Sequence, residues 1–158
     1  NAGAPATGTD AVHTITIGGT PTGGTFNIAV GGRNQDVTWT ATDATLVANV
    51  DAAMVALYGE ATANFTVAAG TLSSGIGTIT ITYVGTMGKL AVALPTINDD
   101  ALTGTNPTAA IAETTPGVSA TRRGIPKGGL LVDSTNAILY INTGTAIAPT
   151  WTKVGTQS

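Results

Sequence analysis

Apolar and polar residues alternate along the first part of the chain, which is typical of half-buried β-strands. Residues 14–17, 26–30 and 37–40 each place their large apolar side chains on one face and threonine or small residues on the other. The glycine-rich segment GGTPTGG between the first two runs predicts a wide turn. Because short connections favour hairpins, the three runs predict an antiparallel meander.

The next segment has the periodicity of a helix, predicted over about residues 43–58. Thr42 or Asp43 is suited to cap its N-terminus, and Gly59 stands where a left-handed C-terminal residue is expected. One face carries the apolar residues Leu46, Val47, Val50, Ala53, Met54 and Leu57. A single amphipathic helix among strands has to cover one side of a sheet in order to bury this face.

Strand-like alternation then returns several times before the chain changes character. The further predicted strands lie near residues 65–67, 79–83, 90–94 and 109–113, and the tail GGLLVDSTNAILYINTGTAIAPTWTKVG predicts a small meander of three strands. The expected fold is mainly β: an antiparallel β-sandwich or barrel-like domain with one short helix covering a sheet, plus a small C-terminal β-meander. The expected organisation is an extended arm (1–11), a core domain (12–115), a linker (116–128) and the meander (129–158).

Charge is sparse and unevenly distributed. Charged residues make up 9% of the 158 residues, against roughly 25% in an average soluble domain. Two basic and eight acidic residues precede Thr121, a net charge of −6, whereas four basic and one acidic residue follow it, a net charge of +3. The overall charge of −3 argues against a nucleic-acid partner. No apolar stretch approaches the roughly 20 residues of a membrane span, and the absence of cysteine excludes disulfides and thiolate metal sites.

No set of residues predicts catalysis, a cofactor or a metal ion. His13, the sole histidine, shares the parity of the first strand's apolar face and is expected to be structural. Asp99 and Asp100 are adjacent and point to opposite sides of an extended chain, so a solvated turn is favoured over a calcium loop or a carboxylate pair. The doubled glycines lack the lysine and helix of a phosphate loop. Asn64 begins a formal glycosylation sequon.

The residues with the best prospects for contact lie after the predicted core domain. Arg122, Arg123 and Lys127 form the basic cluster of the sequence. This cluster is either a solvated linker or an electrostatic contact with an acidic neighbouring surface. Tyr140 and Trp151 are expected in the core of the tail sheet, or alternatively as anchors of a subunit interface, where aromatic residues are enriched.

Three segments resemble proteins of tailed bacteriophages. The stretch TITIGGTPTGGTFNIAVGGRNQDVTWTATDATLVANVDAAM resembles a domain of phage structural proteins, and ANFTVAAG with TITITYVGTMGKLAVALPTIND resembles the second half of that domain. The tail LLVDSTNAILYINTGTAIAPTWTKVGTQS resembles a C-terminal segment frequent in virion proteins. Together they make the chain similar to capsid decoration (auxiliary head) proteins.

The resemblance implies a non-enzymatic protein on the outer surface of the phage capsid, where it binds the major capsid protein and stabilises the shell. It also implies a homotrimer, with no nucleic-acid or membrane partner. The alternative from a different class is a glycan- or cell-surface-binding adhesion module on a phage head or tail fibre. Sugar sites favour exposed aromatic residues, and few are expected here.

Overall fold

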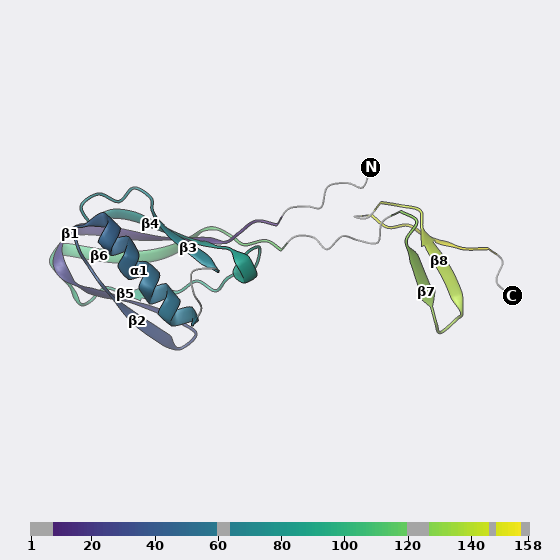
Figure 1. The fold of residues 1–158 in the computed structure, drawn as a ribbon, viewed down its shortest axis with the longest axis horizontal. Helices are drawn as coiled ribbons and strands as arrows, with labels where there is room; N and C mark the ends of the chain where they lie inside the picture. The colour runs from purple at the N-terminus through teal and green to yellow at the C-terminus, as the bar shows by residue number, and fades with distance from the viewer. Residues whose placement is uncertain (1–7, 60–63, 120–126, 146–147, 156–158) are drawn as a thin grey trace. The chain divides into compact units, whose positions relative to one another are not determined.

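The computed structural model describes residues 8–59, 64–119, 127–145 and 148–155. The chain divides into two compact units, and Figure 1 shows the elements of each. The first unit, here called the core domain, comprises Thr9–Ser119. The described residues of the second unit are Gly8, 127–145 and 148–155, and its part after residue 119 is here called the C-terminal unit.

The core domain is an antiparallel β-structure with one α-helix, which confirms the predicted fold class. Its elements are β1 (Val12–Val30), β2 (Arg33–Thr38), α1 (Asp43–Tyr58), β3 (Phe65–Ala69), β4 (Gly77–Tyr83), a 3₁₀ helix η1 (Gly85–Met87), β5 (Thr96–Asn98) and β6 (Leu102–Thr115). The C-terminal unit is a separate sheet of β7 (Leu130–Asp133), β8 (Ile138–Asn142) and β9 (Trp151–Lys153). The predicted meander of three strands is therefore confirmed.

Strand β1 organises the core domain because it pairs with four other strands. Its first part, residues 12–17, lies between β4 and β6, and its last part, residues 25–30, lies between β2 and β5. Figure 1 shows β1 curling at one end of the domain, so that its last part runs back in the opposite direction. The prediction of a hairpin between residues 14–17 and 26–30 is wrong, since neither pairs with the other. The hairpin of β1 and β2 is as expected.

The curl occurs at the glycine-rich segment, where a turn was predicted, but the strand continues through it. Residues 18–24 pair with residues 102–108 of β6, and the register shifts twice along the way. Gly24 has a φ of 89°, and a Cβ at this position would overlap the carbonyl oxygen of Ala101. The glycines therefore permit a close approach of two bent strands. The local pattern suggested a simple turn because it could not reveal a partner strand so far away in the sequence.

Helix α1 covers the inner face of the bent sheet and closes the core. Its buried residues are Leu46, Val50, Ala53, Met54 and Leu57, as the periodicity predicted. They meet the fully buried side chains of Phe26, Ile28, Phe65 and Ile81, among others. Thr42 occupies the N-cap but its hydroxyl makes no capping hydrogen bond, and Gly59 ends the helix in the left-handed conformation, as predicted.

Two other strand predictions need correction. Residues 90–94 form no strand, and Leu90 and Leu94 are each 46% exposed. Alternation was present there, but no strand pairs with the segment, and Pro95 has no N–H to donate to one. The weak strand expected at residues 109–113 is part of the much longer β6, which pairs with β1 over most of its length.

The segments that flank β1 and β6 are also held in the core domain. Thr9, in the segment expected to be an arm, exchanges two backbone hydrogen bonds with Val118, in the segment expected to be a linker. The Asp10 carboxylate accepts a hydrogen bond from the N–H of Lys89 at 2.9 Å, and Ala11 is fully buried. The arm residues 1–7 and the linker residues 120–126 lie outside the described residues.

Candidate functional surface

The C-terminal unit presents apolar side chains on both faces of its small sheet. Residues directly opposite each other in an antiparallel pair share a face, and neighbours along a strand alternate. The register therefore assigns each side chain to a face. The first, called the aromatic face, carries Leu131, Asp133, Ile138, Tyr140, Asn142, Trp151 and Lys153. The second, called the aliphatic face, carries Leu130, Val132, Leu139, Ile141 and Thr152.

Strand β7 is the most exposed apolar segment of this unit. Leu130 is 58% exposed, Leu131 43% and Val132 67%. Three consecutive large apolar residues leave one or more of them in water whichever face of the sheet is covered. Contiguous exposed apolar surface on a folded protein is typical of a site of interaction.

A buried asparagine holds the unit together in place of an apolar core. Asn142 is fully buried, and its Oδ1 accepts hydrogen bonds from the N–H groups of Gly144 (2.9 Å) and Thr150 (3.0 Å). Its Nδ2 donates to the carbonyl of Thr145. One side chain thus fixes the connection between β8 and β9, and this fixes the position of Trp151 at the start of β9.

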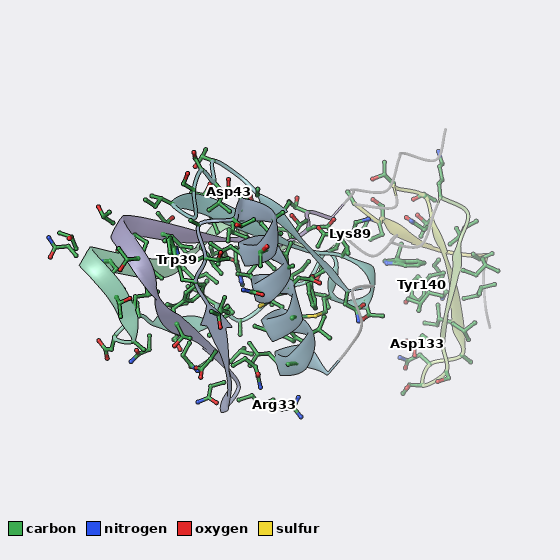
Figure 2. The ribbon with its side chains drawn as sticks, turned by 60° about the vertical axis from the view of Figure 1, so that its left-hand side comes forward. Arg33, Trp39, Asp43, Lys89, Asp133 and Tyr140 are labelled. Atoms are coloured by element: carbon green, nitrogen blue, oxygen red, sulfur yellow. The ribbon has the colours of Figure 1, made fainter. Side chains whose placement is uncertain are left out.

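The turn between β7 and β8 is organised by Asp133. Its carboxylate accepts hydrogen bonds from the Asn136 side chain (2.8 Å) and from the N–H groups of Thr135 and Asn136. The hydrogen bonds from Asn136, first from its side chain and then from its backbone, lower the pKa of Asp133. Figure 2 shows Asp133 and Tyr140 projecting from the same side of the sheet, which agrees with the register.

Three of the five predicted contact residues belong to this described unit. Lys127 is exposed just before β7, while Tyr140 and Trp151 are half-buried on the aromatic face. Arg122 and Arg123 lie outside the described residues. The exposed run at Leu130 and Val132 was missed as a candidate, although its signal was present: three apolar residues in succession do not fit a strand with one wet face.

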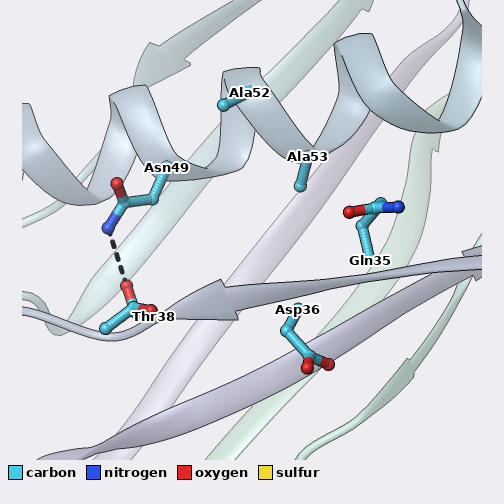
Figure 3. A pocket seen from close by; sticks show the side chains of 6 residues that line it. All are labelled: Gln35, Asp36, Thr38, Asn49, Ala52 and Ala53. Carbon is cyan, nitrogen blue, oxygen red and sulfur yellow. Dashed lines mark hydrogen bonds between the residues drawn. The ribbon is translucent and has the colours of Figure 1, made fainter.

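The core domain has a shallow polar pocket between β2 and α1. Its volume is about 220 Å³, and it is lined by Gln35, Asp36, Thr38, Asn49, Ala52 and Ala53. Figure 3 shows Gln35 and Asn49 at its rim, with the Asn49 amide donating to the carbonyl of Thr38 at 2.9 Å. Asp36 accepts a hydrogen bond from Asn27 at 2.7 Å. The lining offers hydrogen bonds to a small polar molecule but no aromatic ring.

His13 is fully buried at the end of the core and belongs to a short chain of aromatic side chains. Its Nδ1 lies 3.0 Å from the hydroxyl of Tyr83, which lies 3.4 Å from the hydroxyl of Tyr58. Nε2 of His13 has no hydrogen-bond partner among the described residues. Burial lowers the pKa of His13, while the charge of Glu113 acts in the opposite direction. Burial also raises the pKa of Tyr83, and its hydrogen bond with Tyr58 adds to this.

The other polar candidates have structural roles. Asp99 accepts a hydrogen bond from the N–H of Ala109 at 2.8 Å, and Asn98 binds both the N–H and the carboxylate of Asp100. Asn64 is buried, and its Oδ1 accepts hydrogen bonds from the N–H and hydroxyl of Thr86, so it is not placed to accept a glycan.

Within the described ranges, no three His, Asp or Glu side chains are grouped so that they could hold a metal ion. In the same part of the chain, no helix combines the length and apolar character needed to cross a membrane.

The sequence matches no known protein family and no curated protein.

Proposed function

We propose that this chain is a non-enzymatic structural protein of a tailed-phage virion, which binds the outer surface of the capsid and stabilises it. The major capsid protein is the partner. The C-terminal unit makes the contact with the capsid, and through this contact the folded core domain is attached to the shell.

The observation that carries the proposal is the exposure of the C-terminal sheet. Its aromatic face carries Tyr140, Trp151 and Leu131, with Tyr140 directly opposite Leu131, and aromatic residues are enriched among the anchors of protein interfaces. A sheet of three strands is marginal by itself. Packing on a large protein surface would supply the missing second layer.

Charge supports a protein surface as the partner. Lys127 precedes β7 and Lys153 lies on the aromatic face next to Tyr140. With Arg122 and Arg123 they make the sequence after Thr121 basic, at a net charge of +3. An acidic patch on the shell would attract this segment over a distance of about 10 Å at moderate salt. The contact should therefore weaken as salt is added.

Binding can be tested on capsids that lack this chain, prepared from the phage that encodes it. The full chain should sediment with these capsids, and capsids that carry it should release their DNA at a higher temperature. Trp151→Ala should weaken binding at least about tenfold, in the range of an interface anchor. Lys127→Glu should weaken it most at low salt.

A matched control is Thr66→Ala, which changes an exposed residue of β3 in the core domain. It should bind like the unaltered chain. Failure of the unaltered chain to bind, or equal heat resistance of capsids with and without it, would contradict the proposal.

The feature that could support the glycan-binding alternative is the polar pocket at Asp36 and Asn49, but this pocket lacks the aromatic platform typical of sugar sites. A glycan array on which the chain binds, and Asp36→Ala does not, would favour that alternative.

A further inference from the structure

The outer edge of β7 is distinct from the two faces of the sheet and carries exposed apolar residues. The C-terminal sheet has the order β7-β8-β9, so β7 pairs with β8 on one side. In the described part of the unit no strand pairs with its other side. An exposed apolar edge strand is a template for pairing with another chain, and natural edges are usually protected by charges or proline. Leu130, Leu131 and Val132 carry neither.

The hydrogen-bond pattern shows which groups face this edge. Asn142 of β8 exchanges hydrogen bonds with Gly128 and Gly129, whereas the Leu139 carbonyl accepts from Val154 on the β9 side. Residues along a strand alternate in this respect. Tyr140 therefore bonds Leu131, its partner in the register, and the N–H and C=O groups of Leu130 and Val132 point to the outer edge.

We infer that β7 pairs antiparallel with β7 of a second copy of this chain, about a two-fold axis at Leu131. Leu130 of one copy lies opposite Val132 of the other, which uses every outward-facing backbone group of both residues. The two Leu131 side chains face each other in the non-hydrogen-bonded pair at the centre. No other two-fold register brings all four outward-facing residues of the two strands into hydrogen-bonded pairs.

Side chains on both faces fit this register. Across the six-stranded sheet, the aromatic face gains a continuous row in which Tyr140 and Leu131 of one copy meet Leu131 and Tyr140 of the other. The aliphatic face joins Ile141 and Leu130 to Val132 and Leu139 of the second copy. No charged side chain lies on the aliphatic face, as expected for the centre of an interface.

Charge at the ends of the strand is complementary. In this register Asp133 lies opposite Gly129 of the second copy, two residues from Lys127. The two-fold axis thus brings the acidic Asp133 of each copy near the basic Lys127 of the other, once at each end of the paired strands. Two-fold pairing predicts a dimer, whereas the resemblance to decoration proteins implies a trimer, so oligomeric state distinguishes the two.

Self-association of the full chain in solution, without capsids, tests the inference. A four-residue edge is a small interface, so sedimentation should show a monomer–dimer equilibrium with a dissociation constant on the order of 10 to 100 μM. Val132→Lys should raise this constant at least about tenfold, because it places a charge at the paired edge.

Thr152→Lys is the matched control. It adds the same charge to the same aliphatic face, but on the opposite edge strand, and should leave the dissociation constant within about twofold. Equal loss of the dimer in both variants would show stacking of the faces and would overturn the edge pairing. A monomer at concentrations of about 1 mM, or a trimer, would also overturn it.

Cysteine pairs test the register directly, since the chain contains no cysteine. In a non-hydrogen-bonded pair the Cα atoms are about 4.5 Å apart, within reach of a disulfide. Under mild oxidation with diamide, Leu131→Cys should form a covalent dimer at least about tenfold faster than Leu130→Cys. Equal or faster cross-linking of Leu130→Cys would overturn this register. Both measurements are independent of the proposed function, because no capsid takes part in them.

Discussion

The two units of this chain are both antiparallel β-structures, but they bury their apolar side chains to very different extents. In the core domain α1 packs across a bent sheet, and every buried hydrophobic residue of the described chain belongs to that domain. In the C-terminal unit the one buried residue among those described is Asn142, which is polar. Paired strands form in both units, but the apolar core of the described residues lies where α1 adds a second layer to the sheet.

The difference also separates rigidity from binding capacity. In a sheet with a covered face the apolar side chains are already buried, so the sheet serves as a rigid scaffold. An uncovered sheet keeps its apolar side chains available, and its stability then depends on what it binds. We expect the C-terminal unit to be the less stable unit in isolation, and the experiments below are designed to break or sharpen this contrast.

The largest effect is expected from a cavity in the core domain. Phe26 is 1% exposed, and Phe26→Ala should lower the free energy of unfolding by about 3 to 5 kcal/mol, because it removes buried apolar contacts and leaves a void. Urea unfolding monitored by the fluorescence of Trp39, in a background in which Trp151→Phe removes the second tryptophan, would measure this. Val132→Ala, at an exposed site of the C-terminal unit, should change it by less than about 0.5 kcal/mol. Similar losses from both variants would abolish the contrast.

Next in size is the effect of the close approach between Gly24, at the curl of β1, and the carbonyl oxygen of Ala101. Gly24→Ala should destabilise the core domain by about 2 to 3 kcal/mol, because the residue has a positive φ and the new Cβ would overlap the Ala101 carbonyl oxygen. Gly32→Ala is the control: its φ is 80°, but no atom lies within 4 Å of the added Cβ. Its cost should be about 1 kcal/mol. Thermal unfolding would rank the two, and equal costs would show that the close approach to β6 is unimportant.

The polar centre of the C-terminal unit gives a smaller and more local effect. Asn142→Ala removes the acceptor of two backbone N–H groups and should destabilise this unit by about 1 to 3 kcal/mol. Amide hydrogen exchange should accelerate in β7, β8 and β9 and stay unchanged in β1 to β6. Asn136→Ala makes the same chemical change at an exposed site of the turn and should have less effect. Faster exchange in the core domain as well would mean that the units unfold together.

The smallest effect is the pH dependence of the core domain. Burial lowers the pKa of His13 below the 6.5 of a free histidine, so the unfolded chain binds a proton first as the pH falls. The contribution of neutral His13 to the free energy of unfolding is therefore fully present above about pH 6.5. Below this pH the free energy of unfolding falls by up to about 1.4 kcal/mol per pH unit, until the pKa of the folded state is reached. His13→Gln should flatten this part of the curve of unfolding free energy against pH. Parallel curves for the two proteins would exclude His13 as the cause.

Local patterns predicted the parts of the fold that depend on neighbours in sequence. The apolar stripe of α1, its end at Gly59 and the three strands of the C-terminal unit are all readable within short windows. The pairing of residues 18–24 with β6 was not readable, since the partner lies about eighty residues away. The strand predicted at residues 90–94 was wrong because alternation indicates a possible strand but does not show whether a neighbouring strand is there to pair with it.

The candidate surface was predictable in part. Tyr140 and Trp151 could be named because aromatic residues are rare in this chain, and the structure places them on one face of a small sheet. That β7 would be an edge strand depends on the order of strands in the sheet, which residue types do not reveal. The same holds for Asn142, whose burial follows from the path of a loop.

The pairing of β1 with β6 has a consequence for how this chain acquires its structure. The two ends of that contact are separated by about a hundred residues, and mainly-β proteins rich in such distant contacts fold slowly, in milliseconds to seconds. During synthesis the ribosome must release residue 115 before the ladder can be completed. Until then β1 lacks one of its neighbours along most of its length, and this unpaired strand edge makes the incomplete chain prone to aggregation.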